Sequence, residues 1–173
     1  MPEALPLRLP RRLDALQAET RLRRLRAETF EAATLTLWAH ALGAPDDAPA
    51  GWLLCHARAR RALLWPHALP AAPGHEGAEA ELRLAASLPP SADVVSRLWF
   101  WERMVARRHW QVTLRGTPAR AVALPLWLGY SPNRRGGHRL MVISGLGGDA
   151  LPTLKNAVLW ELRQLAAAPA GAV

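Results

Sequence analysis

A chain of 173 residues, half of them apolar, is long enough to bury a core and short enough to form one domain. No apolar run approaches the roughly 18 to 20 residues that span a bilayer, and the first residues lack the apolar segment of a secretory signal. We therefore expect a cytoplasmic protein without a transmembrane segment. Its single cysteine, Cys55, excludes an internal disulfide and favours a reducing compartment.

The positive charge is concentrated in one quarter of the chain. The formal net charge is +8, and residues 97–139 contain nine arginines against one acidic residue, Glu102. The segments before and after this quarter are close to neutral. Such a distribution favours a polyanionic partner, either nucleic acid or an acidic protein.

Prolines in residues 1–10 predict an extended arm, followed by a single domain over residues 11–168 and a short tail over 169–173. Apolar residues at helical spacing predict a helix from Arg11 to about Thr29. Its arginines suit either a face that binds nucleic acid or a membrane surface, or a solvated helix side, and we favour the solvated side. Residues 30–42 fit an extension of that helix or, through the alternating TLTLW, a strand, which we favour.

The next part of the chain predicts two strands. Residues 44–51 have turn composition, and 51–66 resemble one long strand. After a loop rich in proline and alanine, strict alternation over 79–88 predicts a strand with Leu82, Leu84 and Leu88 facing the core. Pro89 and Pro90 end it.

The carboxy-terminal half begins with a helix. Ser91 is a suitable N-cap, and the apolar residues that follow predict a helix that continues to Arg108. Residues 109–114 and 120–130 predict two antiparallel strands, joined to a third by the basic turn SPNRRGG. That third strand, 140–143, is apolar on both faces, which places it in the middle of the sheet. A helix over about 151–165 completes the chain.

Together these elements predict an α+β fold with a mostly antiparallel sheet and the order αβββαβββα. Two βββα units in tandem would explain this order, and Trp38, Trp99 and Trp160 recur at a spacing of 61 residues. The element order is similar to that of small type III secretion chaperones, which dimerise and hold their partners in extended form. Those chaperones tend to be acidic, whereas this chain is basic.

No residue pattern indicates catalysis, a metal site or a cofactor. Cys55 and His56 are adjacent in a predicted strand, so their side chains point to opposite faces and cannot act as a nucleophile with its base. The six histidines lack the spacing of metal ligands, and paired carboxylates are scarce. The sequence leaves enzymatic activity undecided, and of the two interpretations we favour a protein that is not an enzyme.

A glycine-rich segment resembles a phosphate loop. The backbone N–H groups of Gly145, Gly147 and Gly148 could cradle a phosphate between a predicted strand and helix. No strand follows that helix, and no acidic residue is placed to bind a ribose. We favour a flexible turn, which makes a nucleotide-using enzyme the least favoured function.

The basic quarter provides the main site prediction. The antiparallel path of the predicted strands brings the end of the second helix and the SPNRRGG turn to the same end of the sheet. Glycines in the turn would let a phosphate approach, and Trp110, Trp127 or Tyr130 could stack on bases if exposed. The alternative is a set of ordinary solvated arginines. The predicted anion-binding and nucleic-acid-binding residues are Arg103, Arg107, Arg108, His109, Arg134, Arg135, His138 and Arg139.

We thus expect a non-catalytic binding protein whose arginine-rich segment, residues 103–139, engages nucleic acid or another polyanion. The alternative is a homodimeric assembly or secretion chaperone, or an adaptor, that uses the exposed tryptophans Trp99, Trp101 and Trp160 as a protein interface.

Overall fold

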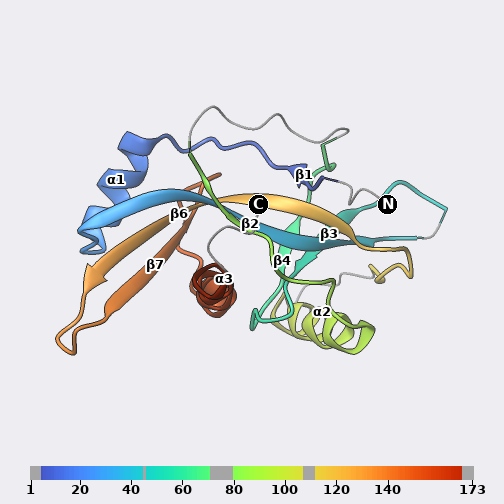
Figure 1. The fold of residues 1–173 in the computed structure, drawn as a ribbon. Helices are drawn as coiled ribbons and strands as arrows, with labels where there is room; N and C mark the ends of the chain where they lie inside the picture. The colour runs from blue at the N-terminus through green and yellow to red at the C-terminus, as the bar shows by residue number, and fades with distance from the viewer. Residues whose placement is uncertain (1–4, 45, 71–79, 107–111, 169–173) are drawn as a thin grey trace.

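The computed structural model describes residues 5–44, 46–70, 80–106 and 112–168. It has an α+β fold in which three helices pack on a mostly antiparallel seven-stranded sheet (Figure 1), as the sequence predicts. In chain order the elements are β1 (Leu7–Arg8), α1 (Ala15–Arg24), β2 (Thr29–Leu42), β3 (Gly51–Cys55), β4 (Leu63–Trp65), β5 (Leu82–Leu84), α2 (Ala92–Ala106), β6 (Arg120–Pro132), β7 (His138–Ser144), the 3-10 turn η1 (Pro152–Leu154) and α3 (Lys155–Ala167).

Two long strands, β2 and β6, form the centre of the sheet. They pair antiparallel from Thr29 opposite Tyr130 to Ala39 opposite Arg120. The strand order is β1-β6-β2-β3-β4, with β5 also pairing with β2 and β7 also pairing with β6. Each central strand therefore has an outer edge that two shorter strands share.

Three hydrophobic clusters attach the helices to this sheet. The largest lies on one face and joins the apolar side of β2 and β6 to Ala157 and Val158 of α3. A second cluster joins α1 to Trp127 and β7, and a third joins α2 to β3. Successive β3 residues belong to different clusters, Leu53 facing α2 and Leu54 facing the α3 cluster, so β3 is covered on both sides.

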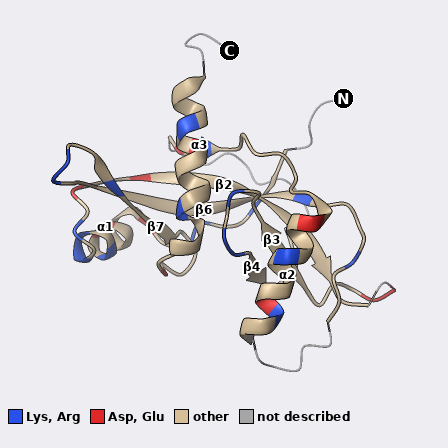
Figure 2. Cartoon of the chain, turned by 90° about the horizontal axis from the view of Figure 1, so that it is seen from below, with Lys and Arg blue, Asp and Glu red and all other residues tan. Residues whose placement is uncertain are grey.

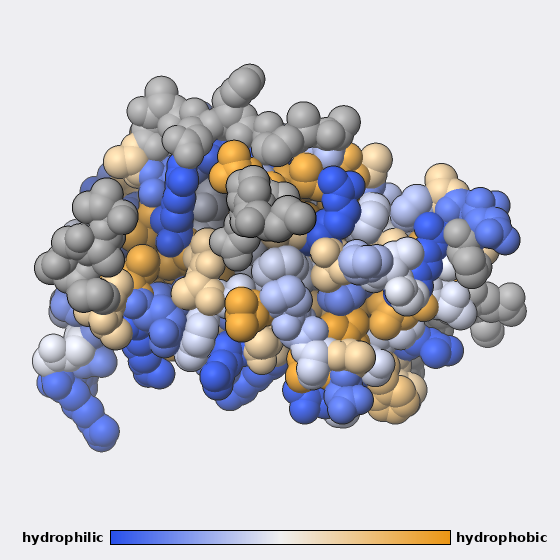
Figure 3. Space-filling model, turned by 45° about the vertical axis from the view of Figure 1, so that its right-hand side comes forward, coloured by the Kyte–Doolittle hydropathy of each residue, from blue (hydrophilic) through white to orange (hydrophobic). Residues whose placement is uncertain are grey.

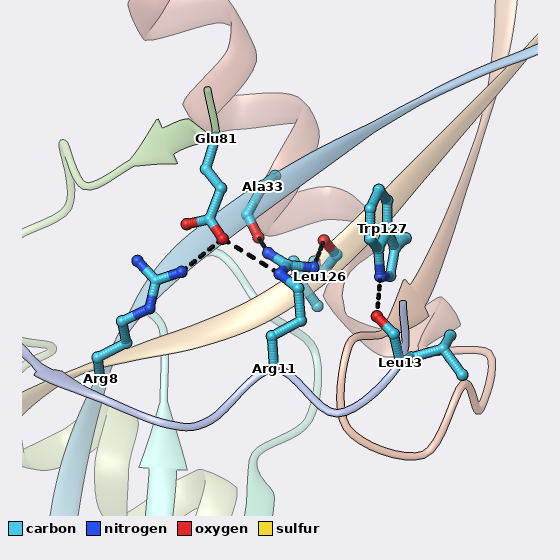
Figure 4. Close-up of polar contacts among 7 residues, drawn as sticks. All are labelled: Arg8, Arg11, Leu13, Ala33, Glu81, Leu126 and Trp127. Carbon is cyan, nitrogen blue, oxygen red and sulfur yellow. Dashed lines mark hydrogen bonds and ion pairs between the residues drawn. The ribbon is translucent and has the colours of Figure 1, made fainter. Parts of the chain in front are cut away.

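The N-terminal arm crosses the sheet face opposite α3. Figure 4 shows how Arg11 fastens it: the guanidinium donates to the carbonyl oxygens of Ala33 and Leu126 at 2.9 and 2.8 Å and to Glu81 at 3.1 Å. The same guanidinium lies 4.8 Å from the centre of the Trp127 ring. Because these partners come from β2, β6 and the segment before β5, one side chain ties the arm to three distant parts of the chain.

A buried carboxylate closes a gap in the sheet. On one edge of β2, β5 pairs with Ala33–Leu35 and β3 pairs with Trp38–Leu42, and both strands turn away at residues 36–37. Glu161 of α3, 1% exposed, fills this gap.

Glu161 accepts three hydrogen bonds from the diverging chains. Its donors are His56 Nε2 at 3.0 Å, Ala86 N at 2.8 Å and Ser87 N at 3.1 Å. The N–H of Arg58 donates to His56 Nδ1 at 3.0 Å, so Nε2 of the imidazole carries the proton that Glu161 accepts. One side chain of α3 thus satisfies two backbone N–H groups that a continuous strand would otherwise pair, and one buried imidazole N–H.

The helices lie where the sequence predicts them, but α1 is shorter than the predicted helix over Arg11 to about Thr29. The favoured strand over residues 30–42 is confirmed by β2, and α2 begins after Ser91, whose hydroxyl accepts from Val94 N at 3.3 Å. The first helix starts at Ala15 instead of Arg11, because Asp14 caps it and residues 5–13 form the arm.

Several predicted strands are shorter or placed differently. The long strand over 51–66 is two strands, β3 and β4, and the strand over 79–88 is reduced to β5, which leaves Leu88 76% exposed. In the described part of 109–114, only Leu114 forms a bridge, with Leu42. Consequently, among the described residues, four strands lie between α1 and α2 and two lie between α2 and α3, instead of three and three. The central pairing joins β2 of the first group to β6 of the second, so these strands do not divide into two separate βββα units.

The position of β7 also differs from prediction. Leu140 to Ile143 are buried on both faces as expected, but among the described strands β7 has β6 as its one neighbour, with an isolated bridge from Ile143 to Ala150, and so lies at a sheet edge. The α1 cluster covers one face and the α3 cluster the other. The chain after β7 protects its free edge, since Leu151 N donates to Val142 O at 2.9 Å.

The Glu161 contacts predict a large stability effect. In Glu161→Ala, the buried donors of His56 and Ser87 and the partly buried N–H of Ala86 lose their acceptor, so we expect the free energy of unfolding to fall by about 3–5 kcal/mol in urea denaturation followed by circular dichroism. Glu161→Gln keeps one accepting oxygen and should cost less. The exposed Glu28→Ala is the control and should change stability by less than about 0.5 kcal/mol. Equal stability of E161A and E28A would contradict this role.

Candidate nucleic-acid interface

Helix α1 is fixed at one end of the sheet by its cap and its apolar side. Asp14 Oδ1 accepts from Gln17 N at 2.8 Å while Gln17 Oε1 accepts from Asp14 N at 3.1 Å, which forms a capping box. Ala18 and Leu22 are buried against Trp127 and its cluster. The opposite side of the helix, which carries the arginines, is left to solvent.

A glycine allows α1 to approach the sheet closely. A Cβ atom on Gly129 of β6 would lie 2.8 Å from Leu22 Cδ2 and 2.9 Å from Ala27 Cβ, which is closer than real Cβ contacts allow. The helix end is therefore seated directly on the backbone of β6.

The turn between β6 and β7 is ordered by one side chain. Asn133 Oδ1 accepts from Arg135 N at 2.9 Å and from Gly137 N at 3.0 Å, and Gly136 has a positive φ of 81°. This arrangement holds Arg134 and Arg135 at the tip with both side chains exposed.

The helix and the hairpin meet in one basic surface. Arg139 of β7 donates to the carbonyl oxygen of Leu25 at 3.2 Å, which joins the two elements. Figure 2 shows their arginines at the same end of the molecule, and hydrophilic side chains project at the lower left of Figure 3. We call this surface the basic end; its exposed arginines are Arg21, Arg23, Arg24, Arg26, Arg134, Arg135 and Arg139.

Few carboxylates balance the basic end. Glu19 forms an ion pair with Arg23 at 2.7 Å, and Glu28 lies nearby in sequence. Glu31 accepts a hydrogen bond from the Tyr130 hydroxyl at 2.5 Å, and burial together with this contact raises the pKa of Tyr130. The three glutamates leave the seven arginines in clear excess.

The predicted basic patch is only partly assembled. Arg134, Arg135, His138 and Arg139 lie together on the hairpin, but Arg103 lies on α2, which packs on β3. β3 pairs with residues 38–42 of β2, so at least nine residues, or roughly 30 Å, separate it from the hairpin end. Arg107, Arg108 and His109 lie outside the described residues.

The absent strand pairing explains this correction. The prediction required residues 109–114 to run beside β6, which would return the end of α2 to the hairpin. Instead Gly43 N donates to Thr113 O and Arg115 N donates to Ala41 O, both at 2.9 Å. Residues 113–115 therefore lie beside the end of β2 that is far from the hairpin. The arginines that lie beside the hairpin are those of α1, which the sequence led us to interpret as a solvated helix side, and not those of α2.

The predicted aromatic contacts also differ from what the sequence suggested. Trp99, expected in a protein interface, is 7% exposed in the α2 cluster, because it packs toward β3. Trp101 is 52% exposed. Trp160 is partly buried, with the Arg58 guanidinium 5.2 Å from its ring centre.

The aromatic rings expected to stack on bases are not free to do so. Trp127 is 4% exposed and Tyr130 is bound to Glu31. Trp110 lies outside the described residues. Arginine is therefore the side chain that the basic end offers to a ligand.

The glycine-rich loop does not present a phosphate cradle. The N–H groups of Gly145, Leu146 and Gly148 all donate within the chain, to Pro125 O, Ser144 Oγ and Ser144 O respectively. A Cβ on Gly148, which has a φ of 76°, would lie 2.7 Å from Arg21, so that side chain covers the loop. The favoured interpretation as a turn fits this geometry.

Catalytic and metal-binding groups do not gather elsewhere in the described ranges. Cys55 is fully buried, and burial followed by the charge of Glu102 raises the pKa of its thiol to about 12, so it is not a thiolate at neutral pH. His56 faces Glu161 in the core. No group of three or more His, Cys, Asp or Glu that could hold a metal ion occurs within the described residues.

Comparison with protein-family models, curated protein sequences and solved structures finds no significant match. Within the described residues, no helix is long and apolar enough to cross a membrane.

Because α1 packs directly on the backbone of β6 at Gly129, adding a methyl group at this position should destabilise the protein. Gly129→Ala should lower the free energy of unfolding by about 1–3 kcal/mol, because the new Cβ overlaps Leu22 and Ala27. Amide exchange in α1 should accelerate more than exchange in α2. Gly116→Ala is the control, since nothing lies within 4 Å of a Cβ there. Unchanged exchange in α1 would show that the helix can shift without loss.

Proposed function

We propose that the chain is a non-catalytic protein whose basic end binds nucleic acid. The observation that carries this proposal is the set of seven exposed arginines that two packed elements hold on one surface. Arginine forks bind phosphate oxygens in a bidentate manner, and a polyanion can engage several of them at once. The sequence pI of about 11.4 favours the same class of partner.

The shape of the basic end fits a nucleic-acid groove. β2 begins opposite Tyr130, whereas β6 and β7 continue their pairing to Pro132 and His138, so the hairpin tip extends past the rest of the sheet. A two-stranded ribbon is one of the elements that the major groove of DNA admits. In this arrangement Arg134 and Arg135 would bind phosphates along the edges of the groove, and the arginines of α1 would contact the flanking phosphates.

One strained residue supports the use of this surface. Arg26 follows α1 with a φ of 70°, in the left-handed region that a helix end usually assigns to glycine. An arginine there costs about 1 kcal/mol relative to glycine. A charged side chain kept at that cost is consistent with a role in binding.

The hairpin arginines can be tested against arginines at the far end. Fluorescence anisotropy with duplex and single-stranded DNA and RNA should give a negative dependence of log K on log salt. Arg134→Ala with Arg135→Ala should lower affinity roughly tenfold at low salt and reduce the slope by about 2, because two phosphate contacts are lost. Arg97→Ala with Arg103→Ala removes the same charge from α2 and should have little effect.

A second variant separates binding from folding. Arg26→Gly should raise stability, since glycine relieves the positive φ, yet it should weaken binding. The proposal is wrong if no nucleic acid binds at low salt, if binding lacks a salt slope, or if the two double variants weaken it equally.

A specific observation also favours a second function, self-association through α2. Phe100, Trp101, Met104 and Val105 are 56, 52, 59 and 58% exposed and, at spacings of one and four residues, form one apolar side of this helix. Exposed apolar groups in such a row are typical of an interface. We propose that two copies pair through this side, as a homodimeric adaptor or chaperone would.

Light scattering coupled to size exclusion tests this pairing. The protein should be a dimer, and Trp101→Glu with Met104→Glu should convert it to a folded monomer by placing charges in the contact. Leu165→Glu alters another exposed apolar residue, on α3, and should leave the dimer intact. A monomer at every concentration would eliminate the second function without affecting the first.

A further inference from the structure

A cavity of about 260 Å³ lies between the N-terminal arm and the sheet, on the face opposite α3. Thr36 and Trp38 of β2 line its sheet side, Leu5 lines it from the arm, and Ser87 and Leu88 line it from the segment after β5. Leu5 and Leu88 are 66 and 76% exposed, so the rim is apolar. Every lining residue belongs to the described part of the chain.

Two of these side chains have polar atoms without a partner. Trp38 Nε1 and Ser87 Oγ are both buried, and neither forms a hydrogen bond in the described structure; Ser87 is 6% exposed. Buried polar atoms are nearly always paired, so two unpaired ones on residues that line the same cavity point to a ligand as the missing partner. The indole N–H can only donate, and the serine hydroxyl can also donate, so that partner is a hydrogen-bond acceptor.

We propose that this cavity binds a small apolar molecule that carries a carboxylate or carbonyl oxygen. The oxygen accepts from Trp38 and Ser87, and the apolar body lies along the arm and Leu88. An engineered cavity of about 150 Å³ holds benzene, so the present volume suits a body of about ten non-hydrogen atoms. An adjoining hollow of about 80 Å³ shares Leu5, Pro6 and Thr36 with this cavity, so a longer apolar body can extend into it.

Nuclear magnetic resonance of the tryptophan indoles provides a test specific to this cavity. The chain has eight tryptophans, and Trp38→Phe identifies the Trp38 indole signal as the one that disappears. Titration with octanoate should move this signal saturably downfield, as a new acceptor binds the N–H, and should leave the exposed Trp101 signal unchanged. Nonan-2-one, a neutral carbonyl, tests whether the charge contributes.

Two further variants distinguish a binding site from a structural defect. Ser87→Ala should weaken octanoate binding at least threefold without lowering the melting temperature of the unliganded protein, because it removes an unpaired group. Ala121→Leu, which fills the cavity from β6, should abolish binding, and the other indole signals report whether each variant is folded. The proposal fails if millimolar octanoate and nonan-2-one both leave the Trp38 signal in place, if A121L binds as well as the wild type, or if octylammonium binds as tightly as octanoate.

Discussion

The carboxylate of Glu161 holds together the part of the structure that regular pairing leaves open. β5 and β3 approach the same edge of β2 from opposite directions and diverge before they meet. The N–H groups released there would be unpaired in the core, which is costly, but Glu161 accepts from both diverging chains. Because Glu161 is on α3, the same contacts fix the last helix against the sheet.

This gap also explains most of what the sequence could not predict. The chain between Gly51 and Pro66 contains no glycine or proline to mark a break, and residues 79–88 alternate regularly between apolar and polar residues. Both strands end early, where His56, Ala86 and Ser87 turn to a carboxylate far along the chain. A local pattern carries no information about such a partner, so the periodicity overestimates both strands.

Elements whose stability comes from local pattern and composition were predictable. The apolar face of β6, the cap of α2 and the turn at Asn133 all have signals within a few residues, and so does the cap of α1 at Asp14, which the prediction of a start at Arg11 overlooked. The basic end was predictable only for its hairpin half, because its other half depends on Gly129 admitting α1. The arginines of α2 were assigned to it through a strand over 109–114 whose described part lies beside the end of β2 instead of β6. The cavity at Trp38 had no sequence signal, since it depends on where the arm and residues 85–89 come to lie.

The pairing of β2 with β6 has a consequence for how the protein is made. Residues 29–39 pair with residues 120–130. During synthesis on the ribosome, the edge of β2 that pairs with β6 therefore stays unpaired until most of the chain has been translated. Contacts this distant in sequence make for slow folding. An apolar strand exposed for that long is a hazard for aggregation, and at that stage this chain would have the greatest need of a chaperone.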